Sequence, residues 1–278
     1  MIDTHLQDKV VLISGANNPT GIGAATARAL AREGAKVAIT YLRLSPDRSG
    51  LQIDEVERAG SPGLAYYHAL RMRSADDLLR SIHSAGGQAD AREADLSDPS
   101  SIPGLFDWVE ANFGPVDILV NNAAHYDDSD TIFTISQETI DQTFQVNVRA
   151  AVLLIAEFVR RYQGRQGQWG RVINLSTDAA QTFAGQITYG ASKAAMEAFT
   201  RSIAIELGPL GITVNAVAPG PVQTGYISAA FEAEIIPSIP VQRIGRPEDI
   251  AETIVFLASE QSDWLTGQVI KVSGGHAL

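Results

Sequence analysis

Tyr189 and Lys193 are two residues whose types and spacing could carry acid–base chemistry. The pattern of residues 189–207 predicts a helix, and side chains four apart in a helix lie one turn apart on one face. An ammonium about 4 Å from a phenol is worth roughly 4 kcal/mol at an effective dielectric constant near 20. That interaction could lower the phenol pKa from about 10 to about 7, so that Tyr189 exchanges a proton with a carbonyl or an alcohol. Taken alone, the spacing is more often that of two ordinary helix-surface residues.

The rest of the chain alternates short apolar strands with helical patterns, which is the order that a doubly wound parallel sheet requires. Strands are predicted at residues 9–14, 36–41, 89–94, 116–120, 171–176, 212–217 and 268–272. Helices are predicted at residues 24–33, 76–85, 136–162, 189–207 and 247–259, with a further helix after residue 97. We therefore expect one α/β domain over residues 1–278, a Rossmann fold whose doubly wound parallel sheet has about seven strands flanked by helices.

Composition excludes several classes of function. The chain has 278 residues and a net charge of −11, which suits neither a general nucleic-acid binder nor a protein of anionic membranes. It has no cysteine, so disulfides, thiolate catalysis and cysteine-ligated metals are excluded. The five histidines show no metal-ligand spacing, and no metal is expected. Because neither a signal peptide nor a membrane-spanning run is evident, we expect a soluble, cytoplasmic protein.

A glycine-rich loop follows the first predicted strand. Gly15 opens it, and Gly21-Ile22-Gly23 leads directly into the helix at residues 24–33. Glycines at a strand-to-helix turn allow the backbone to approach a pyrophosphate, which then lies on the positive end of the helix. A purely structural turn is the alternative, but the strand–helix–strand context favours a dinucleotide.

The order of these motifs resembles the short-chain dehydrogenase/reductase family. The resemblance covers residues 9–275 and is closest to the 3-oxoacyl-thioester reductase and glucose-dehydrogenase-like branches, through an ending that begins at Arg243 and includes Gly274-Gly275. The residues that carry it are Gly15, Gly21, Ile22, Gly23, Asp95, Leu96, Asn121, Asn122, Ala123, Asn147, Ser176, Tyr189, Lys193, Pro219, Gly220 and Thr224.

The resemblance implies a catalytic set of Ser176, Tyr189, Lys193 and Asn147. Ser176 would hydrogen-bond the substrate oxygen, Tyr189 would protonate it, and Lys193 would lower the tyrosine pKa and bind the nicotinamide ribose. Asn147 would hold a water beside Lys193, or else be a buried amide bonded to backbone. Ser176 stands thirteen residues before Tyr189, the usual spacing, and its neighbour Thr177 is the less favoured hydroxyl.

The same resemblance implies cofactor contacts at the ends of several strands. Asp95 and Leu96 would bind adenine, although Asp95 also fits a turn carboxylate. After the fourth strand the contacts would be Asn122, Ala123 and Ala124. After the sixth they would be Pro219, Gly220, Val222 and Thr224, where a simple turn is the alternative.

Three departures from the family pattern bear on the cofactor and the substrate. Five residues, Asn17 and Asn18 among them, separate Gly15 from Gly21 where three are usual, and Ala124 replaces a glycine. Residues 44–72 are predicted to form an insertion, for which a lid, an oligomer contact and a disordered loop are the alternative roles. Residues 225–240 should cover the substrate, and their apolar side chains fit either an acyl chain or core packing.

Cofactor choice is expected at the end of the second strand. A carboxylate there would bind a ribose 2′-hydroxyl, whereas this chain has Tyr41 and, two residues on, Arg43. We therefore predict NADP(H) in preference to NAD(H), with Arg43 on the 2′-phosphate.

These features predict an NAD(P)(H)-dependent oxidoreductase that transfers hydride between nicotinamide and a carbonyl or secondary alcohol, with a 3-oxoacyl thioester as one candidate. A catalytically silent dinucleotide sensor or scaffold, and an epimerase or dehydratase, are the competing hypotheses. The resemblance also implies a homo-oligomer, a tetramer or a dimer. The physiological substrate is not predicted.

Overall fold

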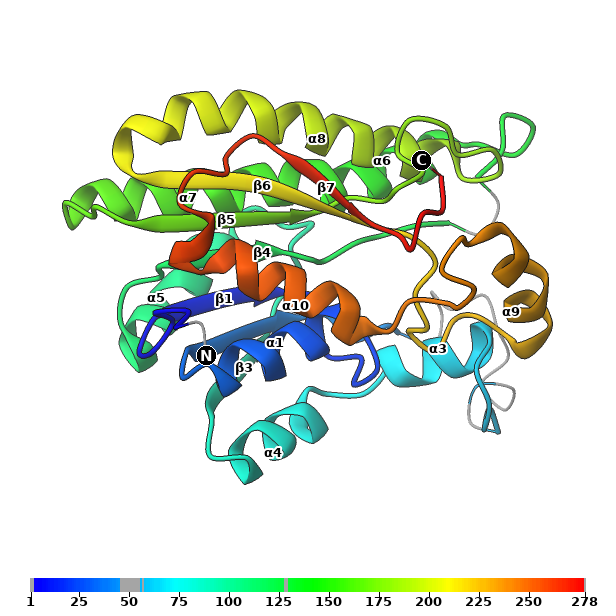
Figure 1. Cartoon of the computed structure of the whole chain (residues 1–278), viewed down its shortest axis with the longest axis horizontal. Helices are drawn as coiled ribbons and strands as arrows, with labels where there is room; N and C mark the ends of the chain where they lie inside the picture. Colours follow the sequence, from blue (N-terminus) through cyan, green and yellow to red (C-terminus); the bar gives the residue numbers. More distant parts are fainter. Residues whose placement is uncertain (1–2, 46–55, 57, 128–129, 278) are drawn as a thin grey trace.

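A parallel sheet forms the centre of the molecule. The computed structural model describes residues 3–45, 56, 58–127 and 130–277, and within them the strand order is β3-β2-β1-β4-β5-β6-β7 (Figure 1). The strands are β1 (Val10–Ser14), β2 (Lys36–Tyr41), β3 (Gln88–Glu93), β4 (Ile118–Asn121), β5 (Gly170–Leu175), β6 (Ile212–Pro219) and β7 (Val269–Val272). All six strand pairs described are parallel. The predicted fold class is confirmed.

Helices cover both faces of the sheet, which explains why the central strands are apolar on both sides. One layer holds α1 (Ile22–Arg32), α4 (Asp76–Ser84) and α10 (Pro247–Ala258). The other holds α5 (Ser101–Phe113), α7 (Ala151–Gly164) and α8 (Ile187–Leu207). Every residue of β1 is buried between these layers. The edge strands β3 and β7 are partly exposed, because each has a neighbour on only one side.

Parallel strands bring their carboxyl ends to one edge of the sheet, and the loops at that edge carry the shorter helices. Figure 1 shows α3 (Leu64–Arg71) and α9 (Ala229–Ile235) together beyond this edge. The 3₁₀ turn η4 (Ile236–Ser238) directly continues α9, whereas η3 (Gly208–Leu210) and η5 (Glu260–Ser262) lie in other connections. Thus part of the predicted 44–72 insertion is the helix α3, whereas residues 46–55 and 57 lie outside the described residues.

The helix predicted over residues 136–162 is interrupted. It consists of α6 (Gln137–Phe144), a π-helical segment η2 (Gln145–Ala150) and α7. A π-helical turn adds a residue to the turn and shifts the side chains that follow, and such turns are frequent at functional sites. Asn147 lies inside η2 and is buried. In the part of the chain that the structure describes, no helix is both long and apolar enough to cross a membrane.

Candidate active site

One face of α8 carries a row of polar side chains toward the ends of β4 and β5. Tyr189, Lys193, Glu197 and Thr200 follow one another at helical spacing, and the last three are buried. The Lys193 ammonium donates to the Leu175 carbonyl (Nζ···O 2.8 Å). Farther along the helix, Thr200 accepts from the Asn174 side chain, and Asn174 in turn accepts from Asn121. The row therefore ties α8 to the carboxyl ends of two central strands.

The structure brings Tyr189 and Lys193 together, but not in the electrostatic state that the sequence predicted. The Lys193 Nζ atom lies over the Tyr189 ring, 5.5 Å from its centroid. Desolvation of the half-buried phenol raises the pKa of Tyr189, with smaller contributions from Tyr67 and Asp178. Burial also lowers the pKa of Lys193 to about 8. The direction of this shift is opposite to the expected lowering, because desolvation of the phenolate is its largest cause.

The hydroxyl group of Ser176 donates a hydrogen bond to another side chain of the protein. Its Oγ atom donates to Glu197 Oε1 (2.7 Å), and both residues are buried. The other oxygen of Glu197 accepts a longer hydrogen bond from Gln181 (3.3 Å). Thr177 is only partly buried, and among the described residues its hydroxyl accepts one long hydrogen bond, from the Ala179 amide (3.5 Å). Of the two neighbouring hydroxyls, that of Ser176 donates its proton to Glu197, whereas the hydrogen bond described for Thr177 does not use its proton.

Asp130 fixes the first turn of α8. Its side chain is buried, and Oδ2 accepts from the backbone amides of Thr188 (2.7 Å) and Tyr189 (2.9 Å). Its backbone carbonyl accepts from the Ile187 amide. These amides have no acceptor inside the helix, and a carboxylate at a helix N-terminus also opposes the positive end of the helix dipole. Asp130 thereby holds the backbone of Tyr189 in place.

Asn147 clamps the loop that follows β4. Its amide donates to the His125 carbonyl (2.9 Å) and to Ser192 Oγ (2.9 Å), and its oxygen accepts from the His125 amide (2.7 Å). Ser192 donates onward to the Tyr189 carbonyl. The described contacts match the alternative role, a buried amide bonded to backbone. They also link the β4 loop to the first turn of α8, which carries Tyr189.

The glycine-rich loop packs against the loop after β4 so closely that side chains would not fit. Gly15 has φ +74°, and a Cβ on it would lie 2.6 Å from Ala123 Cα. A Cβ on Gly23 would lie 2.5 Å from the Asn122 side chain, which donates to the Ser14 and Gly15 carbonyls. Ala124 continues this loop and is partly buried.

The start of α1 suits a phosphate. Gly21 is its N-cap residue and offers no side-chain acceptor to the first amides of the helix, and Ile22 begins the helix. Such amides, together with the helix dipole, attract an anion. The glycine cradle and this helix end therefore fit a dinucleotide pyrophosphate.

Asn17 and Asn18 have structural partners. Asn17 donates to the carbonyls of Arg71 (2.8 Å) and Arg73 (2.9 Å), at and beyond the end of α3. Asn18 donates to the Thr224 carbonyl (3.0 Å). The long glycine loop thus binds both α3 and the loop after β6, through the side chains of Asn17 and Asn18.

The segment after β6 is a close-packed turn. Pro219 ends β6, and a Cβ on Gly220 would lie 2.8 Å from Ser273 Cα and 2.9 Å from Asp178 Oδ2. Asp178 is buried and pairs with His276 (2.8 Å). Burial raises the pKa of Asp178, and the histidine partly offsets that effect. Val222 is buried and forms a parallel bridge with Gly245.

The predicted adenosine end contains an acid that sequence reasoning missed. Arg43 pairs with Glu93, the last residue of β3: its Nε atom donates to Oε1 (3.1 Å) and Oε2 (2.9 Å), and its Nη2 atom lies 2.9 Å from Oε2. The pairing raises the pKa of Arg43 and lowers that of Glu93. Tyr41 lies opposite Glu93 in the parallel pairing. Register across β2 and β3 brings the acid there, and no local sequence signal marks it.

Asp95 and Leu96 follow β3. The Asp95 carboxylate accepts from the Ser97 amide (2.8 Å), as in a turn, and Leu96 is buried in the core. Asp95 therefore acts as a turn carboxylate in the structure, independently of any contact with adenine.

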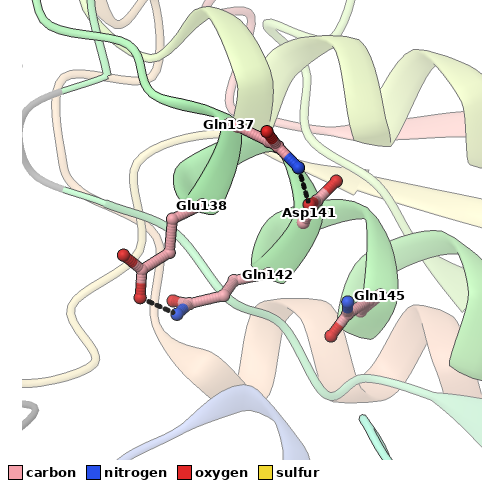
Figure 2. A pocket seen from close by; sticks show the side chains of 5 residues that line it. All are labelled: Gln137, Glu138, Asp141, Gln142 and Gln145. Carbon is pink, nitrogen blue, oxygen red and sulfur yellow. Dashed lines mark hydrogen bonds between the residues drawn. The ribbon is translucent and has the colours of Figure 1, made fainter.

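Two surface hollows differ in their relation to these residues. One, of about 410 Å³, is lined by Arg43, Leu44, Ser45, Met72 and Glu93, and so lies at the predicted adenosine end. Figure 2 shows the other, of about 480 Å³, lined by five polar residues of α6 and its end: Gln137, Glu138, Asp141, Gln142 and Gln145. Gln137 pairs with Asp141 and Gln142 with Glu138 along the helix, and none of the five belongs to the predicted site.

The chain is similar to known oxidoreductases over nearly its whole length. Residues 57–277 match the family described as enoyl-(acyl carrier protein) reductase. An uncharacterized oxidoreductase of Bacillus subtilis is 34% identical, with 98% of each chain covered. An NADPH-dependent aldehyde reductase of Arabidopsis thaliana is 35% identical over 98% of this chain and 95% of its own.

The fold of this chain is also similar to the folds of solved structures. A short-chain dehydrogenase/reductase from Serratia marcescens superposes with a TM-score of 0.80 at 30% identity, covering 98% of this chain and 99% of its own. A blue fluorescent protein from a metagenomic library, solved in complex with NADPH, gives a TM-score of 0.79 at 30% identity with the same coverage.

Proposed function

The chain belongs to the short-chain dehydrogenase/reductase family and is an NAD(P)-dependent oxidoreductase, and on this premise we propose that Tyr189 is its general acid and base. The substrate is a carbonyl in one direction and a secondary alcohol in the other. The observation that carries the proposal is the position of Tyr189 and Lys193 on one face of α8, beside the ends of β4 and β5. The glycine-rich loop packs against the same β4 end.

In the direction of reduction, Tyr189 donates its phenolic proton to the substrate oxygen. The nicotinamide, when bound, supplies the hydride. Burial keeps the phenol protonated at neutral pH, so it is present as the acid. Lys193, with a pKa of about 8, is mostly charged at pH 7 and stabilises the phenolate that the proton leaves behind.

A second hydrogen bond to the substrate oxygen comes from the end of β5, where Ser176 and Thr177 carry hydroxyls. Because Ser176 already donates to Glu197, we assign the donation to Thr177, and we assign to Ser176 the support of that strand end. Asn147 contributes by holding the β4 loop and, through Ser192, the Tyr189 turn. The residues of the glycine loop, the 121–124 loop and the 219–224 turn bind the cofactor.

For the cofactor we propose NADP(H) in preference to NAD(H). Arg43 supplies a guanidinium for the 2′-phosphate, at the end of β2 and beside the hollow described above. Glu93 opposes this choice by pairing with the same guanidinium, so the preference depends on that pair opening or sharing its charge. An NADPH-bound structural neighbour and NADPH-dependent relatives support the proposal.

We also propose a cytoplasmic homo-oligomer, a tetramer or a dimer. Oligomer formation is supported by exposed apolar side chains on α6, α7 and α8: Ile140, Leu153, Phe199 and Ile205. Large apolar side chains exposed on adjacent helices are typical of subunit contacts. Light scattering on the purified protein would give the mass of the assembly.

The experiment that tests the function is NADPH oxidation with an activated ketone such as 2,3-butanedione. The wild-type protein should turn over, and Tyr189→Phe should lose at least about a hundredfold in kcat, since general acid catalysis contributes roughly that much. NADPH binding by the variant, measured by calorimetry, should persist. Undiminished turnover in the variant would refute the role of Tyr189, and cofactor binding without turnover in the wild type would favour a sensor or scaffold.

A further inference from the structure

A cluster of aromatic rings packs against the ring of Tyr189 and is not explained by the acid–base chemistry. Tyr126 meets Tyr189 edge to face, with ring centroids 6.5 Å apart, and Phe183 meets it in the same way at 5.8 Å. Tyr226 packs edge to face on Tyr126 at 5.9 Å. Tyr67 packs on Tyr226 at 5.7 Å and on Tyr126 at 6.4 Å. Tyr67, Tyr126, Phe183 and Tyr226, here called the aromatic wall, come from four separate segments.

The ring of Tyr67 belongs to the insertion. It lies on α3, which the chain fixes at both ends. At the C-terminal end, Asn17 of the glycine loop holds the carbonyls of Arg71 and Arg73. At the N-terminal end, the Gly63 amide donates to the Gly225 carbonyl (2.9 Å), beside Tyr226. The Arg71 guanidinium stacks over the Tyr67 ring at 5.3 Å from its centroid. The position of Tyr67 is therefore set by two loops of the site and by its own helix.

The wall contacts the catalytic residue itself, so it borders the place where the reacting carbonyl must lie. A carbonyl that takes a proton from Tyr189 directs its oxygen at that hydroxyl, and its substituents then meet the neighbouring side chains. Two of these neighbours, Tyr126 and Phe183, are aromatic and meet the Tyr189 ring edge to face. Aromatic rings attract one another edge to face or offset, because their faces are negative and their edges positive.

We propose that the aromatic wall selects carbonyl substrates bearing a planar aromatic ring next to the carbonyl group, and that Tyr67 of the insertion completes it. This proposal rests on the proposed function. A flat ring can insert beside Tyr126 and Tyr226 and offer them its own faces and edges. A saturated ring of the same size is thicker and has no such edge and face, and a flexible acyl chain also lacks the aromatic edge and face that these contacts need.

The test compares 1-phenyl-1,2-propanedione with 1-cyclohexyl-1,2-propanedione, which share their dione and carbon count and differ in ring planarity. With NADPH as the reductant, we expect kcat/KM for the phenyl compound to be higher by about tenfold or more, a usual size for discrimination by an apolar pocket. A 3-oxoacyl thioester, such as an acetoacetyl pantetheine, is the aliphatic comparison and should be the poorer substrate.

Substitutions in the aromatic wall then test whether the wall causes the preference for the phenyl compound. Tyr67→Leu and Tyr226→Leu should each reduce the phenyl-to-cyclohexyl ratio toward one. Tyr66→Leu is the matched control, since Tyr66 is on the same helix and no ring contact of the wall involves it. It should keep the wild-type ratio, and thermal unfolding should verify that all three variants are folded.

The outcomes separate this proposal from the proposed function. A wild-type ratio near one, a better thioester, or an unchanged ratio in Tyr67→Leu and Tyr226→Leu would overturn the aromatic wall while reduction itself stands. Failure to reduce any of these compounds and 2,3-butanedione would overturn the proposed function and, with it, the substrate class.

Discussion

Two regions along the carboxyl edge of the sheet, here called the catalytic end and the adenosine end after their proposed roles, hold their polar side chains in different ways. At the catalytic end, beyond β4 and β5, Asp130, Asn147 and Glu197 are buried and bonded to other segments. At the adenosine end, beyond β2 and β3, Arg43 is exposed and its pair with Glu93 faces solvent. A buried polar group that loses its partner costs far more than an exposed one. Substitutions should therefore affect both chemistry and folding at the catalytic end, and cofactor choice at the adenosine end.

The largest effect is expected from the hydroxyls at the end of β5. Thr177→Val should lower kcat by about a hundredfold or more, as loss of one donor to a developing oxyanion does. Ser176→Ala should lower it less, because the Ser176 proton is already donated to Glu197. Steady-state kinetics at saturating NADPH would measure both.

A larger loss of kcat in Ser176→Ala than in Thr177→Val would instead indicate that Ser176 contacts the substrate. It would mean that the pair with Glu197 opens during turnover. Glu197→Gln is informative in that case, because it removes the carboxylate and should then raise the activity that depends on Ser176.

The second effect concerns the buried charge of Lys193. Its pKa is about 8 in the folded protein against an ordinary value of 10.5, so between these values the unfolded chain binds a proton that the folded one does not. Stability therefore rises with pH across this window, by up to about 3 kcal/mol from this group.

Urea unfolding at pH 7.5 and pH 10 would measure this linkage. The difference in unfolding free energy between the wild type and Lys193→Met should shift in favour of the wild type at the higher pH. A difference that does not change with pH would show that Lys193 is as well solvated as the exposed side chains of the adenosine end.

The third effect is expected at the N-terminus of α8. Asp130→Ala removes an acceptor from the Thr188 and Tyr189 amides and should destabilise the fold by about 2 kcal/mol. It should also lower kcat, since the Tyr189 backbone loses its anchor. Asp130→Asn keeps an acceptor and should cost less. Asp141→Ala, at an exposed position of α6, is the neutral control. Equal unfolding midpoints for the Asp130 and Asp141 variants would contradict the cap.

The catalytic end also shows how far sequence reasoning reaches. Periodicity predicted the helix that joins Tyr189 to Lys193, and Glu197 was detectable in principle because it lies four residues beyond Lys193 on the same face. Asp130 was not detectable, since its partners are 58 and 59 residues away and only the tertiary fold brings them together. The π-helical turn at Asn147 was also hidden, because the apolar pattern continues through it.

The same limit applies at the adenosine end. Reading along β2 gave Tyr41 and Arg43 and no acid, and on that reading the guanidinium was available to a phosphate. Glu93 is 50 residues away and reaches Arg43 only because β3 pairs in register with β2. Cofactor preference depends on charges from two strands, and one strand end does not determine it.

The smallest effect follows from that pair. Arg43→Ala should weaken NADPH binding by about tenfold and leave NADH binding nearly unchanged, since only the 2′-phosphate meets the guanidinium. Glu93→Gln should act in the opposite direction and favour NADPH, because it frees Arg43 and removes a negative charge near the phosphate. Arg80→Ala, an exposed arginine on α4, is the control for net charge. If Arg43→Ala weakened NADH and NADPH equally, Arg43 would support the loop and not the phosphate. If Glu93→Gln instead weakened NADH binding alone, Glu93 would be a ligand of the ribose hydroxyl, and the adenosine end would be built for NAD(H).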